Sequence, residues 1–127
     1  PKGLKTSNLL YNYDNAVSTI QRGNEEIILV EGIFDVWAYH RIGIENAVAV
    51  FGSNLSKHQI KEILKLNVTV TLSFDNDDAG NKATEKAIKS LSGMTVLKKI
   101  ALPEGKDPCD CSENELMNSY LSRQVIV

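Results

Sequence analysis

Residues 27–41, IILVEGIFDVWAYHR, contain the pattern that decides the predicted fold. The apolar run at 27–30 is typical of a strand that is buried on both faces. The apolar run stops at Glu31-Gly32. Residues 33–41 then suit a helix that ends at Gly43. A short buried strand followed at once by a helix is the repeating unit of a parallel α/β sheet.

The same unit recurs further along the chain. Apolar runs predict three more strands, at residues 47–50, 68–72 and 95–102. Helices are predicted at 56–66, 79–90 and 116–121, and the residue pairs Ser56/Gln59 and Ser112/Glu115 have the spacing of capping boxes. We therefore expect an α/β fold, in which a Rossmann-like four-stranded parallel sheet is flanked by helices in a single domain.

Length and composition limit the organisation of the chain. With 127 residues, of which 43% are hydrophobic and 24% charged, there is material for one compact domain. We expect an arm or linker at 1–24, the central domain at 25–104, and an acidic turn with a C-terminal helix at 105–127. No apolar run approaches the ~20 residues that span a bilayer, and the amino terminus lacks the features of a signal peptide. The first residue is not Met, which indicates a fragment or a processed chain. A cytoplasmic protein without a membrane partner is expected.

The net charge and the two cysteines narrow the possible functions. A net charge of −2 argues against a nucleic-acid binder that works by bulk charge alone. Cys109 and Cys111 form a C-x-C pair that lacks the gap of a zinc knuckle, and no second Cys/His pair lies nearby. We predict free thiols in a reducing compartment.

Acidic residues follow three of the four predicted strands. Glu31 ends the first strand, Asp75 and Asp77 follow the third, and Asp107 lies in a turn after the fourth. Functional sites of open parallel sheets form beyond the carboxyl ends of the strands. Carboxylates gathered there repel one another unless a divalent cation neutralises them, and oxygen ligands of this kind favour Mg²⁺ or Mn²⁺. The competing interpretation is that these residues only cap helices and form turns, as Asp78 would directly before a helix.

Two other acidic motifs fit less well. Asp75 and Asp77 imitate the start of an EF-hand loop, but Ala79 and Lys86 occupy positions where calcium ligands are expected. A phosphoaspartate enzyme could also place Asp-x-Asp after a strand, but it would leave Glu31-Gly32 unexplained.

Several segments resemble the Toprim domain of bacterial and phage DNA primases. They are VEGIFDV at 30–36, GIENAVA at 43–49, GSNLS at 52–56, FDNDDAG at 74–80 and LPEGKDP at 102–108. Pro1-Lys2 also resembles the linker that precedes Toprim in replicative primases. The EG and DxD motifs indicate Toprim, which topoisomerases and nucleases share, whereas the NAVA and DP segments point to primase.

The resemblance implies roles for the matching residues. Glu31 matches the Toprim glutamate, a metal ligand or general acid/base, and Asp75 and Asp77 match the metal-binding DxD pair. Asp107 matches the first acid of a DPD motif and is the fourth expected ligand. The supporting positions are Asp35, Gly32 and Gly80. The implied chemistry is nucleotidyl transfer, in which divalent ions lower the pKa of the primer 3′-hydroxyl.

The sequence departs from the primase pattern at several positions. Cys109 replaces the second acid of DPD, so a ligand is lost there unless Asp110 substitutes. Asp78 and Asn81 stand where basic residues are common, and Tyr13-Asp14 stands about where a Lys-Gly pair is common. These differences suggest a divergent phage, plasmid or prophage relative with weakened activity.

Two rows of lysines lie at helical spacing. They are Lys57, Lys61 and Lys65 on one predicted helix and Lys82, Lys86 and Lys89 on the next. The ordinary interpretation is a solvated outer face. The alternative is that Lys57, Lys82 and Lys86, together with Lys2, contact the phosphates of a nucleic acid.

The expected function is that of the catalytic Toprim domain of a DNA primase, which makes RNA primers on single-stranded DNA from nucleoside triphosphates and works with a replicative helicase. A Toprim-type nuclease is one alternative, and a noncatalytic DNA- or helicase-binding module with a vestigial site is another. Members of the family usually carry a basic subdomain and often a zinc module before Toprim. The isolated fragment is therefore expected to be inactive alone.

Overall fold

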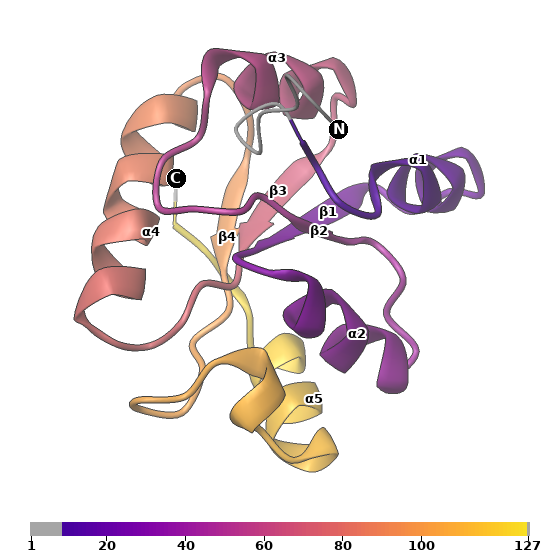
Figure 1. The fold of residues 1–127 in the computed structure, drawn as a ribbon. Coiled ribbons are helices and arrows are strands. Elements are labelled where there is room, and N and C mark those ends of the chain that lie inside the picture. The colour runs from indigo at the N-terminus through magenta and orange to yellow at the C-terminus, as the bar shows by residue number, and fades with distance from the viewer. Residues whose placement is uncertain (1–8, 127) are drawn as a thin grey trace, which may run out of the picture.

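The centre of the molecule is a five-stranded sheet with the strand order β2-β1-β3-β4-β5 (Figure 1). The structure is a computed structural model, and it describes residues 9–126. The strands are β1 (Glu26–Val30), β2 (Ala47–Ala49), β3 (Thr69–Leu72), β4 (Leu97–Lys99) and β5 (Gln124–Val125). The first four strands run parallel, and β5 pairs antiparallel with β4. The predicted α/β class and its four parallel strands are confirmed.

Two features of the sheet differ from the prediction. β4 covers only three residues of the predicted 95–102, although Ile100 N still donates to Leu72 O at 2.9 Å beyond its end. The antiparallel strand β5 was not predicted, because two residues are too few to show a strand pattern. It is held in place by its pairing with β4 and by a hydrogen bond from Ile126 N to Leu97 O at 2.9 Å.

Helices cover both faces of the sheet, so that the fold has three layers. The helices are α1 (Tyr13–Gln21), α2 (Ile33–Arg41), α3 (Lys57–Lys65), α4 (Asp78–Leu91) and α5 (Glu113–Leu121), with a short 3₁₀ turn, η2, at Pro108–Asp110. Apolar residues of α1, α3 and α4 pack on one face of the sheet, and those of α2 and α5 pack on the other. In Figure 1, α2 and α5 lie together at the bottom of the molecule, away from α3 and α4.

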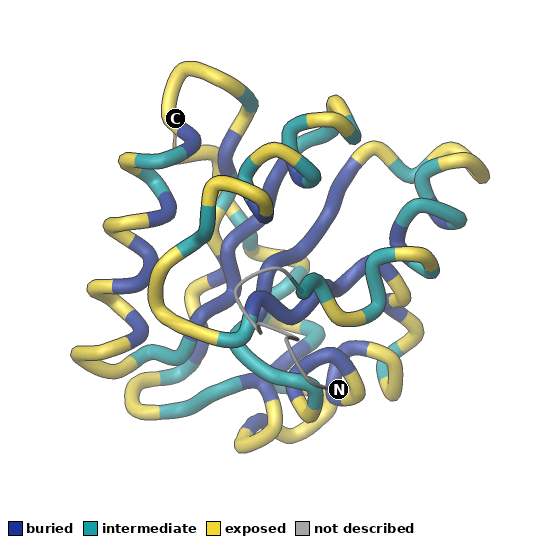
Figure 2. Tube along the Cα trace, turned by 45° about the horizontal axis from the view of Figure 1, so that its top comes forward, coloured by how far each residue is buried: buried dark blue, intermediate teal, exposed yellow. Residues whose placement is uncertain are grey.

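β1 is the strand that joins the two cores. Ile27 and Leu29 belong to the core under α1, α3 and α4, whereas Ile28 and Val30 belong to the core under α2 and α5. All four are completely buried, as is expected of a strand in the middle of a parallel sheet. Figure 2 shows the buried strands running through the interior, with most exposed residues on the outer helix surfaces and in the loops.

The segments on either side of residues 25–104 pack on the same cores. Ala16 of α1 is fully buried in one core, and Leu116 of α5 is buried in the other. Tyr11 also forms an isolated bridge with Ala49 at the edge of the sheet. The division of the chain at residues 24 and 104 stays a prediction. The Pro1-Lys2 linker lies outside the described residues.

Helix capping follows the sequence in two places and differs in a third. Ser56 and Ser112 cap α3 and α5 with the predicted capping boxes. The residue that caps α4 is Asp77, not Asp78, because the Asp77 carboxylate accepts from Gly80 N at 2.7 Å and Asp78 is already the first helical residue. Among residues 9–126, no helix combines the length and the apolar character that a membrane crossing requires.

Candidate metal centre

The predicted acidic residues lie beyond the carboxyl ends of the parallel strands. Glu31 directly follows β1, and Asp75 and Asp77 follow β3 by a few residues. Asp107 lies after β4, where it caps the 3₁₀ turn η2. Because β1 pairs with β3 and β3 with β4, these three segments leave the sheet side by side at the same edge.

Asp75 experiences the charge of every other acidic residue of the site. Burial and, in decreasing order, the charges of Glu31, Asp35, Asp107 and Asp77 together raise its pKa to about 7. Its Oδ1 atom is buried and has no hydrogen-bond partner among the described residues. An uncompensated carboxylate oxygen is costly to bury, so the group favours either a proton or a cation at this position.

Glu31 and Asp35 are affected in the same direction. Burial raises the pKa of Glu31, the charges of Asp77 and Asp107 add to this, and hydrogen bonding to Asp75 partly offsets it. Burial also raises the pKa of Asp35 to about 6, with the charge of Asp107 as the next cause. Asp35 is 7% exposed, and its Oδ2 accepts from Gly32 N at 3.3 Å. The five carboxyl groups therefore form one electrostatically coupled site.

Asp107 belongs to a close group of possible metal ligands. Asp35, Asp107 and Cys109 offer one ligand atom each within 4.8 Å of one another, the one such group found among residues 9–126. Of the four predicted metal ligands, only Asp107 belongs to it. Asp35 was expected only to support the site, and Cys109 was expected to mark a lost ligand. Glu31, Asp75 and Asp77 are not in this group, although the charge of Asp107 raises the pKa of both Glu31 and Asp75.

Asp77 and Asp107 each use one carboxylate oxygen for capping. Asp77 Oδ1 accepts from Gly80 N, and Asp107 Oδ1 accepts from Asp110 N at 2.8 Å. The capping is reciprocal, because Asp110 Oδ2 accepts from Asp107 N at 3.3 Å. Asp110 is exposed, one of its oxygens is used for this bond to the backbone of the turn, and it is not in the group of Asp35, Asp107 and Cys109. The capping interpretation thus holds for one oxygen of Asp77 and one of Asp107.

Gly80 and Asn76 hold the loop after β3 in place. A Cβ atom on Gly80 would lie 1.9 Å from the carbonyl oxygen of Asp75, so only glycine lets the first turn of α4 approach this backbone. Asn76 was not predicted to matter, since an Asn between two Asp residues gives no recognisable signal. It donates from its side chain to Leu102 O at 2.7 Å, and its backbone pairs with Lys106 O at 3.0 Å and with Gly105 N at 2.7 Å. Asn76 therefore joins the segment of Asp75 and Asp77 to the turn that carries Asp107.

The donor set fits a divalent cation. Among the described residues, none of the five carboxylates forms a salt bridge with a lysine or arginine. Carboxylate oxygens are the ligands that Mg²⁺ and Mn²⁺ prefer. Burial and the neighbouring carboxylate of Asp35 raise the pKa of Cys109 to about 12, which keeps the thiol neutral and makes it a poor ligand for a hard ion.

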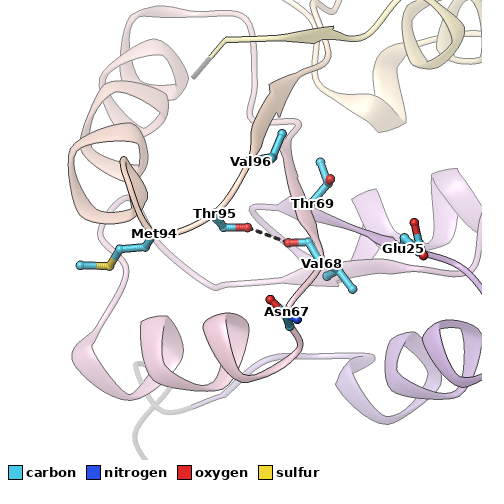
Figure 3. A pocket seen from close by; sticks show the side chains of 7 residues that line it. All are labelled: Glu25, Asn67, Val68, Thr69, Met94, Thr95 and Val96. Carbon is cyan, nitrogen blue, oxygen red and sulfur yellow. Dashed lines mark hydrogen bonds between the residues drawn. The ribbon is translucent and has the colours of Figure 1, made fainter.

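The predicted nucleic-acid contacts lie on the surface of other elements. Lys57 on α3 and Lys82 and Lys86 on α4 are exposed, and Lys2 is outside the described residues. A pocket of about 400 Å³ lies at the amino ends of β3 and β4, lined by Asn67, Val68, Thr69, Met94, Thr95 and Val96 and by Glu25 before β1 (Figure 3). It lies at the opposite end of the strands from the carboxylates. It contains a single acidic residue and no cation, so it does not extend the acidic site.

Comparisons with known proteins agree with this architecture. Residues 28–112 match the Toprim-like family. A DNA primase of Staphylococcus aureus is 43% identical over 102 residues, which cover 79% of this chain and 16% of the primase. The crystal structure of the Aquifex aeolicus primase, with its zinc-binding and RNA polymerase domains, superposes with a TM-score of 0.83 at 32% identity. The superposition covers 98% of this chain and 32% of the A. aeolicus chain.

A third comparison involves a complex with nucleic acid. The RNA polymerase domain of Mycobacterium tuberculosis primase DnaG, in complex with a double-stranded DNA oligomer with a 6-nucleotide overhang, has a TM-score of 0.74 and 28% identity. It covers 95% of this chain and 41% of that one. The chain spans about a sixth of the length of the curated relatives it matches. Since the family match covers most of the sequence, and the acidic residues occupy the strand ends described above, the chain belongs to the Toprim-like family.

Proposed function

We propose that this chain is the metal-dependent catalytic Toprim domain of a DNA primase, which transfers nucleotides to make RNA primers on single-stranded DNA. The observation that carries the proposal is the coupled group of Glu31, Asp35, Asp75, Asp77 and Asp107, in which a buried Asp75 oxygen has no hydrogen-bond partner within residues 9–126. That group needs positive charge, and the relatives of the chain are DNA primases.

We propose Mg²⁺ or Mn²⁺ as the cation, with Glu31, Asp75, Asp77 and Asp107 as ligands. When bound, such an ion supplies charge neutralisation at the triphosphate and lowers the pKa of the attacking 3′-hydroxyl. The residues of the chain have separate tasks. Asp75 offers an unpaired oxygen, Asp35 is held at the start of α2 by its bond to Gly32 N, and the bond of Asn76 to Leu102 O keeps the two acidic loops together.

The proposed partners are a single-stranded DNA template and nucleoside triphosphates. The M. tuberculosis primase domain in complex with an overhang-bearing oligomer supports a DNA partner. Lys57, Lys82 and Lys86 are exposed and are proposed as phosphate contacts. A replicative helicase and an amino-terminal basic subdomain are proposed to complete the active protein in the cytoplasm of a bacterium or a phage-infected cell. On this proposal the isolated chain binds metal but does not prime alone, so robust primer synthesis by this chain would contradict it.

The experiment that tests the metal site is a Mn²⁺ titration followed by electron paramagnetic resonance. The wild-type chain is expected to bind Mn²⁺ saturably, and Asp75→Ala and Asp77→Ala are expected to weaken binding. Glu104→Ala is the matched control, because Glu104 is exposed in the turn before Asp107 and is not among the coupled carboxylates. Absence of binding, or binding that both aspartate variants leave unchanged, would favour the noncatalytic module.

A second experiment distinguishes a primase from a nuclease. Residues 28–112 replace the equivalent segment of the S. aureus primase, and the chimera is assayed for primer synthesis and for DNA cleavage with Mg²⁺ or Mn²⁺. Primer synthesis that is lost on Asp75→Asn supports the primase proposal. Metal-dependent DNA cleavage without primer synthesis would support the Toprim-type nuclease instead.

A further inference from the structure

Two aromatic side chains are exposed on α2, the helix that follows Glu31. Phe34 is 69% exposed and Trp37 is 49% exposed, although large aromatic residues usually contribute to a core. Their ring centroids are 5.2 Å apart at an interplanar angle of 86°. Trp37 Nε1 donates to the Tyr11 hydroxyl at 3.2 Å, so a third aromatic residue, 36% exposed, adjoins Trp37.

A pocket opens beside these rings. Its volume is about 290 Å³, and it is lined by Phe34, Trp37, Ala38, Arg41 and Cys109. The lining therefore consists of apolar and aromatic groups with a single cation. Arg41 is exposed and forms no salt bridge within residues 9–126, which leaves its guanidinium available to an anion.

The pocket is adjacent to the acidic site, because Cys109 belongs to both. Its thiol lies with the carboxylates of Asp35 and Asp107, and the same residue forms one wall of the pocket. Phe34 directly precedes Asp35 in the chain, so an aromatic side chain of the pocket and a carboxylate of the acidic site are sequence neighbours on α2. A ligand in this pocket is thus placed next to the site at which phosphates are proposed to bind.

We propose that this pocket binds an unpaired base of a single-stranded nucleic acid, with the base stacked on Phe34 or Trp37 and the adjoining phosphate at Arg41. The proposal rests on the proposed function and names where the strand meets this domain. Exposed aromatic rings beside a cation, as at Phe34, Trp37 and Arg41, are the combination that binds the bases and phosphates of a single strand. The bases of a duplex are already stacked and would not occupy such a pocket.

The chain provides its own probe for this pocket, because Trp37 is its only tryptophan. The experiment titrates the 127-residue chain with a short oligothymidylate and follows both Trp37 fluorescence and the anisotropy of a label on the oligonucleotide. Saturable quenching with the same midpoint as the anisotropy change is expected. An abasic oligonucleotide of equal length and charge is expected to leave Trp37 fluorescence nearly unchanged.

Two variants test the stacking and the phosphate contact separately. Phe34→Leu is expected to weaken oligothymidylate binding about tenfold, the loss of roughly one stacked base. Arg41→Gln is expected to reduce the slope of log affinity against log salt by about 0.7, the contribution of one phosphate contact. The matched controls are Met94→Ala and Arg22→Gln. Met94 is 64% exposed and does not line the pocket, and Arg22 is an exposed arginine that follows α1. Thermal unfolding of each variant verifies that it is folded.

Several results would overturn the inference, and they differ from those that overturn the proposed function. Binding by anisotropy without quenching, or equal quenching by the abasic strand, places the nucleic acid elsewhere and leaves the proposed function standing. Quenching by ATP but not by the oligothymidylate assigns the pocket to a free nucleotide. Trp37 fluorescence that changes with protein concentration, together with a dimer in ultracentrifugation, assigns it to a second copy of the chain. Absence of any oligonucleotide binding also refutes the inference, while the Mn²⁺ titration decides the metal site independently.

Discussion

Glu26 and Arg123, which are 97 positions apart in the chain, form a two-bonded ion pair. Arg123 Nε donates to Glu26 Oε2 at 2.8 Å, and Arg123 Nη2 donates to Oε1 at 2.9 Å. The Thr71 hydroxyl also donates to Glu26 Oε2, and the guanidinium of Arg123 lies 4.0 Å from the centroid of the Tyr120 ring. Glu26 begins β1 and Arg123 directly precedes β5, so this pair fixes the carboxyl-terminal segment to the middle of the sheet.

Arg123→Met is expected to lower the free energy of unfolding by about 3 kcal/mol, because it leaves a buried carboxylate without its partner. Urea denaturation measures the change. Arg22→Met is the control, since Arg22 pairs with Glu45 in solvent and its loss is expected to change stability by less than about 1 kcal/mol. If both variants lose the same small amount, the pair does not stabilise the C-terminal segment.

Gly80→Ala is expected to destabilise the protein by about 1–3 kcal/mol, because the new methyl group would meet the Asp75 carbonyl at 1.9 Å and force the loop to move. It is also expected to weaken Mn²⁺ binding, since Asp75 moves with the loop. Gly32→Ala is the comparison. Its Cβ would meet only the Asp35 carboxylate at 4.0 Å, and its backbone is extended, so a change within about 1 kcal/mol is expected. Equal tolerance of both alanines in thermal unfolding would argue against the close approach.

The stability of the metal-free protein is expected to fall as the pH rises from about 4 to about 7. The pKa of Asp75 is raised from 3.8 in the unfolded chain to about 7 in the fold, so the folded state holds the extra proton in this interval. The stabilisation is complete below the unfolded pKa and is lost as the pH passes the folded pKa. Urea denaturation in the presence of a chelator at several pH values measures it, and Asp75→Asn is expected to flatten the curve. Saturating Mn²⁺ is expected to oppose the loss, because the cation competes with the proton.

Cys109→Asp is expected to tighten the binding of Mg²⁺ and Mn²⁺ by roughly tenfold, since it adds a hard oxygen ligand beside Asp35 and Asp107. Calorimetric titration measures the affinity. Cys109→Ser keeps a small neutral group at this position and is expected to bind metal as the wild type does. An aspartate variant that binds no better than the serine variant would show that position 109 does not reach the metal.

Lys82→Gln/Lys86→Gln is expected to reduce the slope of log affinity against log salt for single-stranded DNA by about 0.7 for each lysine that contacts a phosphate. Both lysines are exposed and lie one turn apart on α4, which begins beside Asp77. Lys98→Gln/Lys99→Gln on β4 is the matched control for the lost charge. An unchanged slope in the α4 variant would show that its lysines only cover a solvated face.

Local patterns in the sequence predicted most of the secondary structure. The apolar run before Glu31 and the capping boxes at Ser56 and Ser112 depend on neighbouring residues only, and the structure confirms all three. The parallel arrangement also follows, because each predicted strand is joined to the next by a helix. β5 could not be predicted, since its position depends on contacts of Arg123 and Ile126 with residues far away in the sequence.

The acidic residues at the strand ends could be predicted from local patterns, since Glu31 and Asp75 follow apolar runs closely and parallel strands end at a common edge. The residues that come closest could not be predicted in this way. Asp35, Asp107 and Cys109 come together because α2 packs beside η2, and Asp77 uses one oxygen to cap α4. Spacing along the chain fixes the strand end at which a residue lies, whereas loop conformation and side-chain packing fix the distances between residues from different strands.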